Sequence, residues 1–336
     1  MPFSLEFLQN ASKEVVVSTV EKDLEIVKGY INKAIEKAAK EMPYVRPKNV
    51  EIYLHGSYAN KTNIFFPSNL EVCVEIRKTA EYEPDKITVQ TPNKETGETP
   101  IKVEPTYHLY NNYYVEHNLE FSPKDFRDLL FEKLGEVTDQ KCQIHDKVIV
   151  IPAFGKLKHI VEITPCFTFD YYDDIPNMEG GVELSAKAPM FKGVLLYDAS
   201  VGADIITFPK LHAQNGNAKD LACKGNFKKF VRMFKTMNAI ANREQESEDK
   251  ERGYFIECLL FNVPNQIYSG KNLSDAFIKV INYLANCDMD GFVCQNLIWQ
   301  LFGSAVEFWN LSRAEQFVKL IMDLYKTFPP KRTLLA

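Results

Sequence analysis

The sequence predicts an α+β fold in which a β-rich first part precedes a helical second part. Short apolar runs with strand-like alternation extend from Val50 to about Phe169, whereas helical periodicity dominates after Pro209. The chain has 336 residues, of which 45% are hydrophobic and 25% charged, so it is long enough for one large domain or two smaller ones. We therefore expect a core domain over residues 1–210 and a helical lobe over 211–336.

The first part is expected to begin with a long helix and to continue into strands. Apolar residues at helical spacing predict an amphipathic helix from about 12 to 41. Four strands are expected, over residues 52–54, 70–76, 148–151 and 160–163. The short linker 153–156 makes the last two a hairpin. Pro123 at a first-turn position and Gly135 at the far end bound one further helix.

The second part is expected to be a series of helices. Apolar residues on one face between Phe227 and Met237 predict the first of them. Further helices are expected over 255–261, 272–286, 291–309 and 312–327. Two segments are expected to be loops: 91–100, which is rich in Thr, Pro, Asn and Gly, and the charged tract 243–252.

The composition argues against several classes of protein. The formal net charge is −5 and the pI about 5.8, so we expect no strong nucleic-acid footprint. The N-terminus lacks a signal-peptide pattern and no apolar run approaches ~18 residues, so we expect a cytoplasmic protein without a membrane span. The seven cysteines are scattered and the six histidines form no i, i+4 pair, so any metal should be a hard ion held by carboxylates.

One motif carries most of the predicted chemistry. The run His55-Gly56-Ser57-Tyr58 is followed by Asn69-Leu70-Glu71 at the start of an apolar stretch. Glycine lets backbone amides approach phosphate oxygens, and the Ser57 hydroxyl supplies one more donor. Alternate strand positions point Asn69 and Glu71 toward one ion, a pattern typical of nucleotidyltransferases. The alternative is that Glu71 and Glu75 share a strand face that is simply exposed to water.

Four segments together resemble the bacterial CD-NTase family, relatives of cyclic GMP-AMP synthase and oligoadenylate synthase in the polymerase-beta-like nucleotidyltransferase superfamily. The first is the motif just described. The others are 160–165, where Glu162 precedes a proline, the helical segment 227–235, and the segment 254–264. They stand in the family's order over residues 50–265, so the resemblance covers most of the chain.

The resemblance implies a fold and an activity. The fold would be a polymerase-beta-like core, with a mixed sheet and flanking helices, and a helical lobe that closes a central nucleotide cleft in a bilobal molecule. The activity would join ribonucleoside triphosphates into a cyclic di- or trinucleotide second messenger for anti-phage signalling, by two-metal phosphoryl transfer with Mg²⁺ or Mn²⁺. The resemblance also implies a monomer and regulatory proteins encoded nearby.

The resemblance assigns metal-binding and catalytic roles to Asn69, Glu71 and Glu162. Family members use acids at all three positions, mostly aspartates, whereas Asn69 is neutral. Losing one of three formal charges should weaken one metal ion most. Asn69 therefore either disables catalysis or is an introduced substitution that traps bound substrate.

The resemblance assigns nucleotide binding to Gly56, Ser57, Lys235, Tyr254 and Cys166. The Gly-Ser turn would cradle the β- and γ-phosphates, and Lys235 would place a cation on them. Tyr254 would stack on the donor base, and Cys166 would touch the acceptor base. The simpler interpretations are a solvated lysine, a core tyrosine and a buried thiol.

Two readings from other classes stay open. A nucleotide-binding pseudoenzyme is favoured by Asn69. A nucleotidyltransferase acting on RNA ends or on a small molecule would share the Gly-Ser and acid motif. The acidic pI and the segment 254–264 argue against the second.

Overall fold

A computed structural model of the protein describes residues 4–14, 18–42, 45–65, 69–77, 122–171, 191–241, 253–303 and 309–327. The chain divides into two compact units, each built from separate stretches. We call Ser18–Leu54 with Asn69–Leu211 the sheet unit. We call Met1–Val17, His55–Ser68 and His212–Ala336 the helical unit. The division after Leu211 falls inside helix α6 (Pro209–Ala222).

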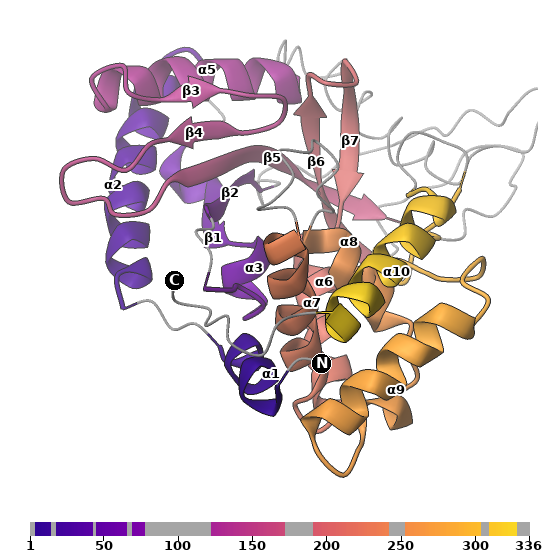
Figure 1. Cartoon of the computed structure of the whole chain (residues 1–336). Helices are drawn as coiled ribbons and strands as arrows, with labels where there is room; N and C mark the ends of the chain where they lie inside the picture. Colours follow the sequence, from indigo (N-terminus) through magenta and orange to yellow (C-terminus); the bar gives the residue numbers. More distant parts are fainter. Residues whose placement is uncertain are drawn as a thin grey trace, which may run out of the picture. The chain divides into compact units, whose positions relative to one another are not determined.

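The sheet unit contains a mixed sheet of seven described strands (Figure 1). They are β1 (Val50–Leu54), β2 (Leu70–Ile76), β3 (Gln143–Ile144), β4 (Ile149–Ile151), β5 (Val161–Tyr171), β6 (Phe191–Asp198) and β7 (Ala203–Thr207). The order β1-β2-β5-β4-β3 is extended by β6, which pairs with the later part of β5 and with β7. Strands β2 and β5 are parallel and every other described pair is antiparallel. The parallel pair therefore lies at the centre of the sheet.

The two faces of the central strands differ in chemistry. Leu70, Val72 and Val74 alternate on β2 with polar or small residues, and Val161 and Ile163 do the same on β5. These five side chains are fully buried and form one apolar face. Because side chains alternate along a strand, the other face carries the acids of both strands.

Two helices cover the apolar face of the sheet. Helix α5 (Pro123–Val137) contacts β5 and β6, and α2 (Val20–Ala38) packs against α5 (Figure 1). Phe126 of α5 meets Phe167 of β5 edge to face, with ring centroids 5.6 Å apart. The helix starts where predicted, because Ser122 and Asp125 form a capping box ahead of it.

A buried aspartate joins α2 to the loop that precedes β5. Asp23 Oδ2 accepts hydrogen bonds from the backbone N–H of Lys158 at 2.9 Å and of His159 at 2.8 Å. It also accepts from the His159 ring at 2.6 Å, since a carboxylate can only accept. These bonds fix the entry of the chain into β5.

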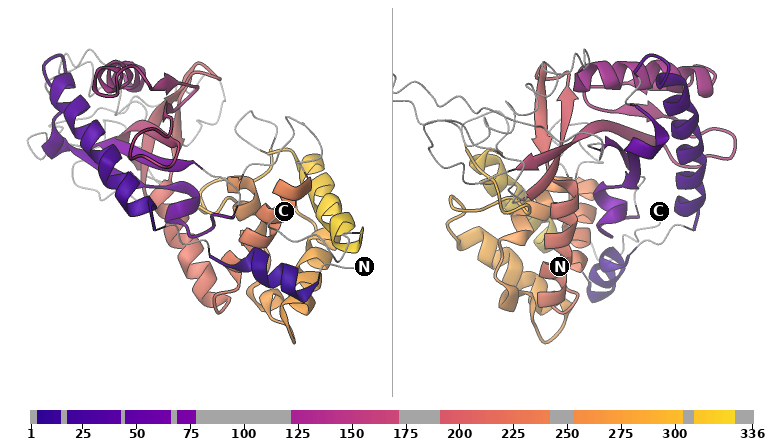
Figure 2. Two further views of the ribbon diagram at one scale, coloured as in Figure 1. Left: turned by 60° about the vertical axis from the view of Figure 1, so that its left-hand side comes forward. Right: turned by 180° about the vertical axis from the view of Figure 1, so that it is seen from behind.

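The helical unit is built around one aromatic core. Its helices are α1 (Leu5–Ser12), α3 (Gly56–Ala59), most of α6, α7 (Phe227–Ala241), α8 (Gly253–Phe261), η3 (Asn265–Tyr268), α9 (Leu273–Asn286) and α10 (Leu311–Thr327). Phe230, Phe234 and Phe277 are fully buried, and the Phe277 ring contacts the rings of both Phe230 and Phe234. Helix α1 packs against α7 and α9, and Figure 2 shows it beside α9. Arg232 of α7 holds the end of α1, because its Nε donates to the Ser12 carbonyl at 2.7 Å.

Most of the predicted elements are confirmed. The α+β class, the four predicted strands and the 148–163 hairpin are present, as are five predicted helices. The N-terminal helix predicted over 12–41 is present as the shorter α2, and α1, which precedes it over Leu5–Ser12, was not predicted. The loops predicted at 91–100 and 243–252 lie outside the described residues.

One predicted helix is wrong. The described residues between 291 and 303 form turns and isolated bridges such as Val293 with Gln300. Asn296 explains the break: its side-chain oxygen accepts from the N–H groups of Ile298 and Trp299, which competes with helical bonding. Leu297 adopts φ 62°, so the helical path is interrupted there.

The described part of the chain contains no helix long and apolar enough to cross a membrane.

Candidate functional site

The sheet unit brings the three predicted metal-binding residues together. Glu71 of β2 and Glu162 of β5 are register partners on adjacent parallel strands. Asn69 stands two positions before Glu71, and its Nδ2 donates to Glu162 Oε1 at 2.6 Å. All three side chains are half-buried. The polar face of the sheet therefore presents two carboxylates and one amide at one place.

The donor set fits a hard divalent cation, with one charge fewer than three carboxylates would give. Both carboxylates and the amide oxygen of Asn69 are oxygen ligands of the kind that Mg²⁺ prefers. Among the described residues, no group of three or more His, Cys, Asp or Glu side chains could hold a metal. The amide nitrogen of Asn69 faces Glu162, so presenting its oxygen to a cation requires rotation of the amide.

The same face of the sheet continues into a region where Cys166 packs in an apolar cluster with Cys73, Val194 and Leu196. Cys166 lies two positions beyond Thr164 on β5, is 0% exposed, and donates from its Sγ to the Val74 carbonyl at 3.7 Å. Burial raises the pKa of the Cys166 thiol, which keeps it neutral. Lys210 Nζ bonds to Glu75 at 2.9 Å on this face. The predicted contact between Cys166 and a base stays a prediction.

The helical unit contains the predicted phosphate-binding residues. Gly56 begins α3 with φ 64°, a conformation that is strained for residues with a side chain, so glycine is required at this turn. Ser57 follows, and its carbonyl accepts from the N–H of Thr62 at 2.9 Å. The Thr62 hydroxyl in turn accepts from Lys235 Nζ at 3.1 Å. Lys235 of α7 is therefore joined to the segment that contains the Gly-Ser turn.

Lys235 is also paired with a residue that the sequence analysis overlooked. Its Nζ donates to Oε1 of Glu257 at 2.6 Å, and both side chains are buried. The sequence neighbours of Glu257 are apolar: Phe255, Ile256 and Cys258 are also buried on α8. An acid inside an apolar helical run was the available signal, because a buried carboxylate persists only when it is paired or hydrogen-bonded.

Tyr254 lies at the start of α8 and is partly exposed. Its ring is tilted by 33° against the His212 ring, with centroids 4.8 Å apart. The preceding residue, Gly253, lies beside Lys235: a Cβ placed on it would be 3.1 Å from the Lys235 Nζ. The helical unit thus brings Lys235 close to the residue that precedes Tyr254.

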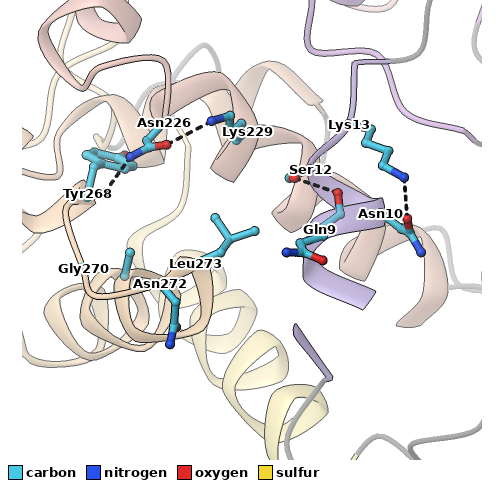
Figure 3. Close-up of a pocket in the computed structure, with 11 residues that line it drawn as sticks. Gln9, Asn10, Ser12, Lys13, Asn226, Lys229, Tyr268, Gly270, Asn272 and Leu273 are labelled. Carbon is cyan, nitrogen blue, oxygen red and sulfur yellow. Dashed lines mark hydrogen bonds between the residues drawn. The ribbon is translucent and has the colours of Figure 1, made fainter. Parts of the chain in front are cut away.

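A hollow of about 570 Å³ lies among α1, α7, η3 and α9 of the helical unit, and none of the predicted site residues lines it (Figure 3). Several of its polar side chains bond to one another or to nearby backbone. Lys13 Nζ donates to Asn10 at 2.8 Å, and Asn226 Nδ2 donates to the Tyr268 carbonyl at 3.1 Å. We assign no ligand to it.

The chain is similar to known proteins along its length. Residues 214–326 match the cGAS/DncV-like nucleotidyltransferase C-terminal helical domain. The chain is 26% identical to the cyclic UMP-AMP synthase of Rhodothermus marinus over 97% of its length and 98% of the relative's. It is 28% identical to the cyclic nucleotide synthase CdnE01 of Staphylococcus haemolyticus over 86% and 89% of the two chains. The resemblance to the CD-NTase family is therefore confirmed.

The fold comparison agrees with this relationship. The structure of the R. marinus CdnE c-UMP-AMP synthase with Apcpp and Upnpp superimposes with a TM-score of 0.70, 24% identity and 99% coverage of both chains. The polymerase-beta-like fold predicted from the resemblance, with a mixed sheet, flanking helices and a helical C-terminal part, is thus the CD-NTase fold.

Proposed function

We propose that this chain is a nucleotidyltransferase that joins ribonucleoside triphosphates into a cyclic di- or trinucleotide. Cyclic nucleotide synthesis is the activity named for the R. marinus and S. haemolyticus relatives, which match nearly the whole chain. The observation that carries the proposal is the pairing of Glu71 with Glu162 on adjacent parallel strands. This pairing supplies two hard anionic ligands on one sheet face, as phosphoryl transfer with a divalent ion requires.

The residues of this chain divide the work as follows. Backbone amides at Gly56 and Ser57, together with the Ser57 hydroxyl, donate to the β- and γ-phosphates. Lys235 neutralises charge on the same phosphates. Tyr254 offers an aromatic face to a base. A ribose hydroxyl attacks the α-phosphorus, its proton passes to solvent, and the α–β bond breaks to release pyrophosphate.

Glu71, Glu162 and the amide oxygen of Asn69 would hold the divalent cation. Mg²⁺ or Mn²⁺ bound there would acidify the attacking hydroxyl and offset the charge of the leaving pyrophosphate. Asn69 contributes no negative charge, so the proposal includes a weakened ion site in this chain.

A nucleotide-binding pseudoenzyme is the second candidate, and one contact favours it. The Asn69 amide already satisfies one Glu162 oxygen at 2.6 Å without a cation. An aspartate at position 69 would place two carboxylates side by side, and their repulsion would favour a bound ion. With asparagine the metal-free arrangement is stabilised instead.

The test is a product assay on the protein and its Asn69→Asp variant. Each is incubated with all four ribonucleoside triphosphates and Mg²⁺ or Mn²⁺, and phosphatase-resistant products are identified by chromatography and mass. Product from both proteins, or from the aspartate form alone, supports the synthase. If neither makes product while triphosphates raise the melting temperature, the pseudoenzyme replaces it.

The same assay addresses the remaining alternative and the biological setting. Transfer to an RNA end or to a small molecule, with no cyclic product, would replace the synthase by a transferase of that kind. We further propose that the protein acts as a cytoplasmic monomer in anti-phage signalling, together with regulatory proteins encoded nearby.

A further inference from the structure

The carboxylate of Glu257 is saturated with hydrogen-bond donors. Oε1 accepts from Thr62 Oγ1 and from Lys235 Nζ, both at 2.6 Å. Oε2 accepts from Asn60 Nδ2 at 3.1 Å and from His212 Nε2 at 2.8 Å. An ionised carboxylate offers about four acceptor positions, so this set fills them.

Glu257 remains ionised although it is only 3% exposed. Burial by itself would raise its pKa, but the positive charge of Lys235 and the hydrogen bond from His212 outweigh burial and lower it. The negative charge is thus a permanent feature of the interior of the helical unit near neutral pH.

One side chain therefore connects four segments of the helical unit. Asn60 and Thr62 follow α3, His212 belongs to α6, Lys235 to α7, and Glu257 itself to α8. The contact with α3 extends further, because the Thr62 N–H donates to the Ser57 carbonyl. The carboxylate is linked in this way both to the cation and to the turn that the proposed function assigns to phosphate binding.

The ammonium group of Lys235 is held by these bonds. A lysine has three N–H donors, and within the described residues Glu257 and Thr62 take two of them. Gly253 confines the same group from another side, since any Cβ there would lie 3.1 Å from both Cε and Nζ. These contacts restrict the flexible Lys235 side chain to one conformation and leave one of its N–H donors for a ligand.

We propose that Glu257 is a positioning residue for the phosphate site. It fixes Lys235 and the 60–62 turn relative to each other, so that the lysine and the Gly56–Ser57 turn engage the same triphosphate. This inference rests on the proposed function, because it gives Glu257 a role only through residues assigned to triphosphate binding. A lysine fixed before binding loses less conformational entropy when the ligand arrives.

The experiment is a double-mutant cycle on triphosphate affinity. Uncleavable α,β-methylene analogues of ATP, GTP, CTP and UTP are titrated with Mg²⁺ into the Asn69→Asp protein by calorimetry, and the tightest analogue is kept. Its affinity is then measured for Glu257→Gln, Lys235→Gln and the double variant in that background. Glu315→Gln, which removes an exposed carboxylate of α10, is the matched control.

We expect Glu257→Gln to weaken binding about tenfold, because the amide loses the charge and part of the acceptor capacity that hold Lys235. In the Lys235→Gln background the same change should have no further effect, since Glu257 acts through the lysine. A merely structural role would instead give additive losses. If Glu257→Gln fails to fold, Thr62→Val replaces it, because it removes a bond to each partner and keeps the side-chain size.

The outcomes separate the two proposals. The positioning role would be overturned by unchanged affinity in Glu257→Gln. It would also be overturned if the double variant bound tenfold more weakly than Lys235→Gln alone. Either result would leave the proposed function standing. If the parent binds none of the four analogues, the proposed function fails and the inference fails with it.

Discussion

Two glutamates, one in each unit, each accept a hydrogen bond from a different asparagine amide, but the two carboxylates have opposite surroundings. In the helical unit, Glu257 is almost fully buried and accepts four hydrogen bonds, including one from Lys235. In the sheet unit, Glu162 is half-buried, accepts from Asn69, and lies beside another carboxylate, Glu71. The first carboxylate is neutralised by the protein itself. The second belongs to a pair of like charges that an added cation would stabilise.

This difference separates a carboxylate that organises structure from carboxylates that are available for chemistry. Burial is tolerated at Glu257 because its partners offset the cost of removing a charge from water. Partial exposure at Glu71 and Glu162 leaves both carboxylates accessible to a ligand. The predictions below test this separation.

The largest effect is expected from Glu257→Ala. The change leaves Lys235 buried without its counter-charge and removes the acceptor of four donors. Breaking a buried pair on one side costs about 3–5 kcal/mol, and urea unfolding should show this loss. Glu315→Ala on the exposed face of α10 should change stability by less than about 0.5 kcal/mol. A loss below about 1 kcal/mol for Glu257→Ala would erase the contrast between the two glutamates.

Glu162→Gln should lower activity strongly and change stability little, whereas Glu257→Ala should mainly lower stability. In the Asn69→Asp protein we expect product formation to fall at least about 100-fold, because one anionic ligand of the divalent ion is lost. The melting temperature should barely change, since the side chain is isosteric and half-buried. Glu132→Gln, an exposed change on α5, is the control and should retain the parent rate. An undiminished rate in Glu162→Gln would remove this residue from the proposed ion site.

Asn69→Asp should make stability depend on a divalent ion. Without metal, the 2.6 Å hydrogen bond to Glu162 is replaced by repulsion between two carboxylates, which should cost about 1–2 kcal/mol. Millimolar Mg²⁺ should restore that stability in Asn69→Asp, whereas it should stabilise the unsubstituted protein less. Thermal unfolding with and without Mg²⁺ measures both. Equal responses of the two proteins would show that position 69 does not contact the ion.

The smallest effect is expected at Asp204 of β7. It sharpens the comparison, because the cost of burying this carboxyl group is not offset by partners as it is at Glu257. Burial, assisted by the charge of nearby Asp125, raises the pKa of Asp204 to about 6. The folded protein therefore binds this proton more tightly than the unfolded chain, and the resulting stabilisation is lost as pH rises through about 6. Asp204→Asn should gain about 1 kcal/mol at pH 8, allowing for partial solvent screening, and nothing below about pH 3.8. An equal change at both pH values would contradict the assignment.

Much of the fold was predictable because its strongest signals are local. The capping box at Ser122, the apolar alternation of β2 and the aromatic face of α7 act within one element. The failed helix at 291–309 had the right composition, but the side chain of Asn296 bonds to the backbone just after it. Helix α1 was missed because it is short and is stabilised by packing against α7 and α9.

The candidate site was predictable only where the motif is contiguous. The pair Asn69 and Glu71 follows from strand alternation within one motif, whereas Glu162, far along the chain, was assigned only through the resemblance to the CD-NTase family. The network around Glu257 joins residues of four segments, and sequence spacing does not show which of them meet. The sign visible in the sequence is an acid within the apolar run 255–261, of the same kind as Glu71 within the apolar run 70–76.

The three hydrogen bonds of Asp23 limit how the chain length can vary near the proposed ion site. They anchor residues 158 and 159 to α2, only a few positions before Glu162. Since strand side chains alternate, inserting or deleting one residue after this anchor would turn Glu162 into the apolar layer beneath α5. We therefore expect length changes to be tolerated in the hairpin before Lys158 and rejected between His159 and Glu162.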